Sequence, residues 1–188
     1  MSQPKNIMQQ KRLPSFYWDC IVKTYWSGQS SFPTALGLMS QNYTQLKEHF
    51  KLFNQQKLNP EEIVQRQRKR DIYQELLQIR LQERNEISAL LSDYANSDMN
   101  FAAQMAVVVA TACLGSEHLW KDLGLPERGA LTLLMSVYFP EFAKKNTQNM
   151  RWKRFIYKQL CELGGDYMCR APSCDTCRSF DECFAPED

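Results

Sequence analysis

Four cysteines lie close together near the end of the chain, in the stretch CRAPSCDTCRSFDEC. They are Cys169, Cys174, Cys177 and Cys183, so their spacing is C-x4-C-x2-C-x5-C. Two residues between thiolates allow a tight turn that directs both sulfurs at one metal centre, and the longer spacers let the outer sulfurs complete the shell. The pattern therefore predicts a site with four sulfur ligands.

The type of metal is less strictly determined by this spacing. Thiolates select zinc, copper(I) or an iron–sulfur cluster. Zinc sites usually hold two close cysteine pairs separated by a long spacer, whereas all four cysteines here lie in one segment. The leading C-x4-C-x2-C matches the ligand spacing of plant-type ferredoxins, whose fourth ligand lies far away. The spacing favours a cluster, leaves zinc as an alternative, and disfavours disulfides because the chain has an odd total of seven cysteines.

Other residues that could do chemistry are weaker candidates. Cys161 precedes Cys169 by eight residues and could be a spare ligand, but we interpret it as a buried structural thiol. His118 follows an apolar segment, where we expect it to cap a helix end rather than bind metal. Ordinary core or surface positions are expected for Cys20, Cys113 and His49. The sequence shows no Ser-His-Asp set and no glycine-rich phosphate loop, so we expect no enzymatic activity.

Composition limits the class of protein. The chain has 188 residues, of which 44% are hydrophobic and 23% charged, as is typical of one folded domain. A net charge of +2 is too small to indicate a nucleic-acid partner. The N-terminal residues lack the apolar core of a secretory signal, and the apolar run at 101–114 is too short to span a bilayer. We therefore expect a cytoplasmic protein with no membrane partner.

Helical patterns precede the cysteine segment. Asn59, Pro60, Glu61 and Glu62 are typical of a helix start. Apolar residues then recur mostly at intervals of three and four and predict one buried stripe, on one long amphipathic helix or on two stacked ones: Ile72, Leu76, Ile79, Ile87, Leu90, Leu91 and Tyr94. The basic run at 65–70 could contact an acidic partner or nucleic acid, but a helix face exposed to solvent is the favoured interpretation.

Three further helices are predicted downstream. Residues 101–114 form a buried helix, since their length and alanines outweigh three valines. The next helix begins at Pro126 and buries Leu131, Leu134, Met135 and Tyr138. The last runs over about 149–163 and ends at Gly164-Gly165; it buries Trp152, Phe155, Ile156, Gln159, Leu160 and Leu163. The fold class is therefore mainly α: one helical domain over residues 1–165, followed by an irregular cysteine-rich metal-binding tail over 166–188.

Three stretches in the second half of the chain follow one another in a specific order: HLWKDLGLP, NMRWKRFIYKQLC, and CRAPSC-x2-C-x5-CF-x-PE. Together they resemble the NifQ family of nitrogen-fixation proteins. The resemblance covers about the last 105 residues well and the first 80 thinly. The family commonly has glycine after the final Cys-Phe, where this chain has Ala185.

The resemblance implies a function that the spacing does not. Members of the family are understood to carry a molybdenum–iron–sulfur cluster and to donate molybdenum for the nitrogenase iron–molybdenum cofactor. Cys169, Cys174, Cys177 and Cys183 would then be the cluster ligands. Implied partners are the cofactor-assembly scaffold, its iron protein, and molybdate or another molybdenum source. A zinc-stapled interaction module and an iron–sulfur electron-transfer protein remain the alternatives.

One group of basic residues could also serve that function. Its members are Arg151, Arg154 and Lys158, with Lys144 and Lys145 upstream. They could attract oxyanionic molybdate or an acidic partner surface, although solvation alone explains them equally well.

Overall fold

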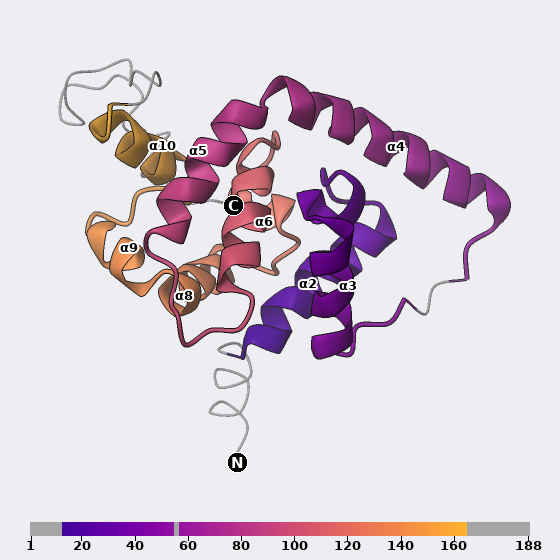
Figure 1. Cartoon of the computed structure of the whole chain (residues 1–188), viewed down its shortest axis with the longest axis horizontal. Coiled ribbons are helices and arrows are strands. Elements are labelled where there is room, and N and C mark those ends of the chain that lie inside the picture. Colours follow the sequence, from indigo (N-terminus) through magenta and orange to yellow (C-terminus); the bar gives the residue numbers. More distant parts are fainter. Residues whose placement is uncertain (1–12, 55–56, 165–188) are drawn as a thin grey trace, which may run out of the picture.

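The structure is a computed structural model that describes residues 13–54 and 57–164 (Figure 1). These residues form nine α-helices and one short 3-10 helix, with no strand among them. The helices are α2 (Pro14–Ser27), η1 (Thr34–Gly37), α3 (Ser40–His49), α4 (Pro60–Ile79), α5 (Leu81–Ser92), α6 (Ala102–Cys113), α7 (Leu119–Asp122), α8 (Arg128–Tyr138), α9 (Pro140–Lys145) and α10 (Trp152–Glu162). The prediction of a mainly α chain is confirmed for these residues. The predicted tail and its boundary at 165/166 lie outside them.

Helix α6 is central to the core. Nine of its twelve side chains are buried, including two valines and four alanines, so the predicted buried helix is confirmed. It packs against α5, and Figure 1 shows it between α5 and the α2 and α3 pair. Small residues allow close approach of neighbouring helices, and the β-branched valines fill the space between them. Among the described residues, no helix is both long enough and apolar enough to cross a bilayer.

The predicted buried stripe is only half correct. Ile87, Leu90 and Leu91 of α5 are buried. The α4 residues are exposed: Ile72 by 58%, Leu76 by 48% and Ile79 by 80%. The chain changes direction at Arg80, which ends α4 and precedes α5. The apolar period therefore continues across a bend, and α4 leaves the core to run along the upper edge of the molecule in Figure 1.

The basic run on α4 was predicted to face solvent. Three of its residues instead contact the body of the protein. The Arg66 guanidinium donates to the Trp26 carbonyl, and Lys69 Nζ donates to the Gly28 carbonyl at 2.6 Å. The Arg70 guanidinium lies 4.3 Å from the ring centroid of Tyr25. These three cations meet the carboxyl end of α2, where unpaired carbonyls favour positive charge. They attach α4 to the body of the protein.

Helix starts largely follow the sequence signals. At the start of α4, the Asn59 side chain accepts from the Glu62 amide at 2.9 Å, and the Glu62 carboxylate accepts from the Asn59 amide at 3.0 Å. This capping box confirms the predicted start. Pro126 lies before the N-cap Glu127 of α8 rather than inside the helix, so that predicted start is wrong by two residues. The four side chains predicted for the interior of this helix are all buried.

Helix α10 follows its predicted pattern closely. It buries Trp152, Phe155, Ile156 and Leu160, as predicted. Gln159 is only half-buried, and Leu163 is 72% exposed, because the helix ends at residue 162 and its last turn extends beyond the core. Gly164 has φ +87, the left-handed conformation that ends helices, in agreement with the predicted stop.

Candidate functional site

The four clustered cysteines lie outside the described residues, so their arrangement stays a prediction. These are Cys169, Cys174, Cys177 and Cys183. Within residues 13–54 and 57–164, no group of three or more His, Cys, Asp or Glu side chains is placed to hold a metal ion.

The cysteines of the helical domain are free thiols. Cys113 is buried, and burial raises the pKa of its thiol to about 12, so it stays protonated at neutral pH. Cys20 is half-buried, and burial likewise raises the pKa of its thiol. Cys161 is half-buried too, so the prediction of a buried thiol is wrong: it lies in the last turn of α10, near the edge of the core. A protonated buried thiol is a poor metal ligand, so Cys113 acts as a core residue, as predicted.

The two histidines lie in different surroundings. The His49 ring packs against two aromatic rings, at 4.7 Å from Phe50 and 5.2 Å from Phe101, centroid to centroid. It is therefore a packing residue, as expected. His118 is the N-cap residue of α7, where its side chain makes no capping bond, and its predicted role at the end of the preceding helix stays a prediction. Its side chain lines a pocket instead.

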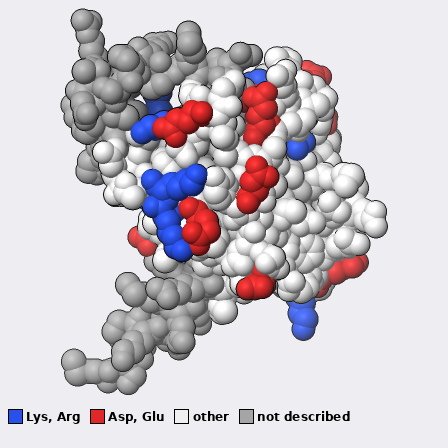
Figure 2. Space-filling model, turned by 60° about the vertical axis from the view of Figure 1, so that its left-hand side comes forward, with Lys and Arg blue, Asp and Glu red and all other residues white. Residues whose placement is uncertain are grey.

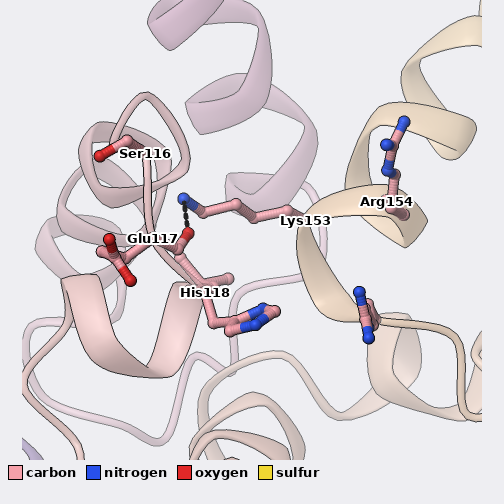
Figure 3. A pocket seen from close by; sticks show the side chains of 7 residues that line it. Ser116, Glu117, His118, Lys153 and Arg154 are labelled. Atoms are coloured by element: carbon pink, nitrogen blue, oxygen red, sulfur yellow. Dashed lines mark hydrogen bonds between the residues drawn. The ribbon is translucent and has the colours of Figure 1, made fainter. Parts of the chain in front are cut away.

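This pocket lies between two segments that are distant in the sequence. One wall is the turn at residues 116–119, and the other is the start of α10, with Arg151, Lys153 and Arg154. Its volume is about 380 Å³, near the lower end of the range for small-molecule sites. Figure 3 shows the His118 ring directed from the turn towards α10, and Arg154 on the opposite wall. The pocket thus gathers nitrogen donors from both walls.

Lys153 joins the two walls. Its Nζ donates to the Gly115 carbonyl at 2.9 Å, to the Glu117 carbonyl at 2.5 Å (dashed in Figure 3) and to Asp122 Oδ2 at 2.5 Å. An ammonium has three N–H donors, so these contacts use all of them. Lys153 therefore shapes the pocket and has no donor left for a ligand.

The charge of Lys153 is balanced by Asp122, whose side chain is only 2% exposed. Burial raises the pKa of Asp122, and the nearby Glu117 carboxylate adds to the rise, while the hydrogen bond and charge of Lys153 lower it. Gly115 leaves the necessary space, since a Cβ there would lie 2.5 Å from Asp122 Oδ1. This close packing holds the turn in one position against α10.

Comparisons with known proteins identify the family. The family model described as NifQ matches residues 17–185. The chain belongs to the NifQ family. Protein NifQ of Azotobacter vinelandii is 38% identical over 182 residues, which are 96% of this chain and 92% of that protein. Protein NifQ of Klebsiella pneumoniae is 37% identical over 161 residues, which are 85% of this chain and 92% of that protein. No solved structure matches the chain.

Membership in NifQ, a family of nitrogen-fixation proteins, confirms the resemblance. The match begins in α2 and extends past Cys183, so it includes the helical domain and the cysteine segment. Two stretches that carried the resemblance, at 118–126 and 149–161, contribute to opposite walls of the pocket. The structure thus brings together two of the NifQ-like segments.

The structure separates the five basic residues that were grouped from the sequence. Arg151 and Arg154 line the pocket. Lys158 Nζ lies 3.9 Å from the Glu162 carboxylate, and Lys144 Nζ lies 2.6 Å from that of Glu141. Lys145 Nζ donates to the Tyr94 hydroxyl at 2.6 Å. Only the two arginines therefore belong to the pocket of this NifQ-family protein.

A second polar cluster anchors α10 to α5. The Arg80 guanidinium binds both Glu83 carboxylate oxygens at 2.6 Å, and the Tyr157 hydroxyl donates to Glu83 Oε1 at 2.5 Å. Burial opposes ionisation of Glu83, but the hydrogen bonds from Arg80 and Tyr157 outweigh it and lower the pKa of this carboxyl. Burial and the bond to Glu83 raise the pKa of Tyr157, which stays protonated and keeps donating. This cluster fixes the helix that carries one pocket wall.

Charges of both signs are neighbours on one face of the molecule. Figure 2 turns the left-hand side of Figure 1 forward, and on its coloured part the basic side chains lie beside acidic ones. Large uncharged areas separate these groups. The charges on this face are therefore balanced locally, in keeping with a net charge of +2.

Sequence reasoning missed two features of the pocket. It did not single out Lys153, although this residue stands between the two arginines in the stretch RWKR. Three basic residues around one buried tryptophan at a helix start were a usable signal. It placed His118 at a helix end, but no local signal could show that its side chain meets a helix more than thirty residues later.

Proposed function

We propose that this protein carries molybdenum within an iron–sulfur cluster and donates it for biosynthesis of the nitrogenase iron–molybdenum cofactor. The observation that carries the proposal is the NifQ family match, which includes Cys169, Cys174, Cys177 and Cys183. The protein is a carrier rather than an enzyme, because the cluster is cargo that it passes on. It works in the cytoplasm, where thiols stay reduced.

The four cysteines are the proposed ligands of this cargo. Thiolates are soft ligands that suit iron–sulfur clusters. All four come from one segment of fifteen residues, CRAPSCDTCRSFDEC. A receiving protein can therefore replace them one at a time without separating helices of the core. Release by such ligand exchange fits a donor better than ligands spread over several packed helices would.

Two kinds of partner follow from a donor role. The receiving side is the scaffold on which the cofactor is assembled, together with the iron protein of nitrogenase. The supplying side is molybdate or a molybdenum storage protein. Neither nucleic acid nor a membrane takes part in the proposed transfer.

Metal analysis of the anaerobically purified full-length chain tests the proposal. We expect a brown protein that contains iron, sulfide and molybdenum. A variant with all four clustered cysteines changed to serine should lose the iron and molybdenum. Cys20→Ser is the matched control, because it removes a thiol of the helical domain and should leave the metal content unchanged. The loaded protein, as sole molybdenum source, should then support cofactor assembly in a mixture of scaffold and iron protein.

Other results would contradict the proposal. A colourless protein with one zinc per chain would indicate a zinc-stapled interaction module. A brown protein without molybdenum, whose cluster is reduced and reoxidised reversibly and is not transferred, would indicate electron transfer. Unchanged iron and molybdenum in the four-serine variant would rule out the cysteine ligands.

A further inference from the structure

We infer that the pocket between the 116–119 turn and the start of α10 binds a tetrahedral oxyanion, with Arg151 and Arg154 as its charged donors. This inference rests on the proposed function in one respect, namely the choice of molybdate as the oxyanion. The described residues that line this pocket all belong to the helical domain.

The α10 wall supplies positive charge and directed donors. A guanidinium carries five N–H donors in a planar fork that matches two oxygens of an oxyanion. Two such groups, Arg151 and Arg154, line the pocket. Arg151 is also the N-cap of the eleven-residue α10, which has no acidic residue in its first turn and no side-chain cap. The helix dipole therefore adds to the attraction for an anion at this end.

The opposite wall supplies uncharged donors. His118 and Ser116 both line the pocket, and in Figure 3 the His118 ring points across the gap towards α10. An imidazole N–H and a hydroxyl can each donate to an oxyanion oxygen. Donors on two walls suit a small anion with oxygens in several directions better than they suit a flat surface contact.

Two charged groups at the pocket do not alter this conclusion. The charge of Lys153 is balanced by the buried carboxylate of Asp122. Glu117 is the acidic residue among the described residues that line the pocket, and Figure 3 shows its carboxylate pointing away from α10. Its negative charge acts on Asp122, where it adds to the rise in pKa caused by burial. The positive side of the pocket is thus the α10 side.

The size of the pocket favours an anion rather than a protein segment. Its volume of about 380 Å³ suits one small oxyanion with bound water. A docking surface for a protein would need hundreds of square ångströms of contact on each partner. We therefore assign the pocket to a free anion, and treat a partner carboxylate as an alternative outcome of the test.

Equilibrium dialysis of molybdate against the full-length four-serine variant tests the inference, because this variant lacks the clustered thiols. We expect saturable binding of one molybdate per chain. Changing Arg151→Gln and Arg154→Gln together should weaken it about tenfold or more, since each charge-assisted bond contributes strongly. The matched control, Lys144→Gln with Lys158→Gln, removes the same charge outside the pocket and should change binding by less than about twofold. Circular dichroism at 222 nm checks that both pairs stay folded.

Several results would overturn the inference. Equal weakening by the two pairs of substitutions would indicate general charge attraction rather than a site. Absence of binding to both the four-serine variant and the cluster-free wild-type chain would exclude the pocket. Equal or tighter binding of sulfate or phosphate in the same dialysis would overturn the assignment to molybdate. Binding of an acidic peptide, but not of molybdate, that depends on the two arginines would assign them to a partner surface.

Failure of this inference and failure of the proposed function give different results. In the otherwise wild-type chain, Arg151→Gln with Arg154→Gln should leave iron content intact and weaken molybdenum loading and delivery. Unchanged molybdenum delivery would show that the pocket takes no part in the transfer, but it would not contradict the proposed carrier role. Loss of the carrier role, seen as a purified protein that contains zinc or no molybdenum, would not affect the binding of molybdate to the four-serine variant in dialysis.

Discussion

The ammonium of Lys153 holds the turn at 115–117 against α10 through bonds that span 38 and 36 residues of sequence. Its ion pair with Asp122 is buried: side-chain exposure is 19% for Lys153 and 2% for Asp122. Removing one partner of a buried pair leaves the other charge without compensation. The pair is therefore sensitive to single substitutions.

We predict that Lys153→Met lowers the free energy of unfolding by about 3 kcal/mol at pH 7.5. The loss should be smaller at low pH. Burial already raises the pKa of Asp122 above its unfolded value, and loss of Lys153 raises it further. A group whose pKa is raised by folding stabilises the protein at low pH. This contribution falls as the pH rises from the pKa of the unfolded state towards that of the folded state. Urea unfolding of both proteins at several pH values between about 4.5 and 7.5 measures this.

Two further variants give this prediction its controls. Lys158→Met removes a more exposed lysine whose partner is 3.9 Å away, and should cost less than about 1 kcal/mol. Asp122→Asn in the Lys153→Met background removes the uncompensated charge, so it should recover part of the lost stability. A pH-independent loss in Lys153→Met would show that the ion pair is not its cause.

At the scale of elements, α4 and α6 differ in how they are held. Helix α4 has twenty residues, of which only Leu77 is buried, whereas α6 buries nine of twelve. Contacts of Arg66, Lys69 and Arg70 with α2 attach α4 at its side. Local opening of a helix costs less free energy when little apolar surface is exposed by it. Helix α4 should therefore open without the rest of the core.

We predict that backbone amides of α4 exchange hydrogen at least about a hundredfold faster than those of α6, measured by mass spectrometry after proteolysis. Asn59→Ala removes the capping box and costs about 1 kcal/mol locally. It should speed exchange further in the first turns of α4 and leave α6 unchanged. Similar protection in both helices would mean that α4 belongs to the cooperative core.

At the scale of the whole molecule, the helical domain has its own core. Buried apolar residues from α2, α5, α6, α8 and α10 form one cluster within the described residues. A chain of this size buries enough apolar surface to fold without a metal. By contrast, domains that depend on a structural metal unfold when it is removed.

We therefore predict that the four-serine variant keeps its helical content and cooperative unfolding. The midpoint in urea, followed by circular dichroism at 222 nm, should correspond to a loss below about 1 kcal/mol compared with the metal-loaded protein. Stripping the wild-type protein with a chelator should have the same small effect. A non-cooperative transition in either case would indicate that the metal staples the fold rather than being cargo.

Local signals were sufficient for much of this protein. The Asn59 to Glu62 start of α4, the apolar run of α6 and the glycine stop of α10 were all predicted, because each depends on neighbouring residues of one helix. The cysteine spacing likewise defines a candidate ligand set by itself. Family membership followed from the order of short stretches along the chain.

Tertiary structure alone decided which faces are covered and which distant residues meet. The same apolar period is buried in α5 and exposed in α4, because the bend at Arg80 turns only one of the two helices onto the core. His118 and Arg154 line one pocket because Lys153 draws the 115–117 turn onto α10. The apolar periodicity of a sequence shows which residues share a face of one helix. Contacts between residues of different helices depend on the path of the chain between those helices.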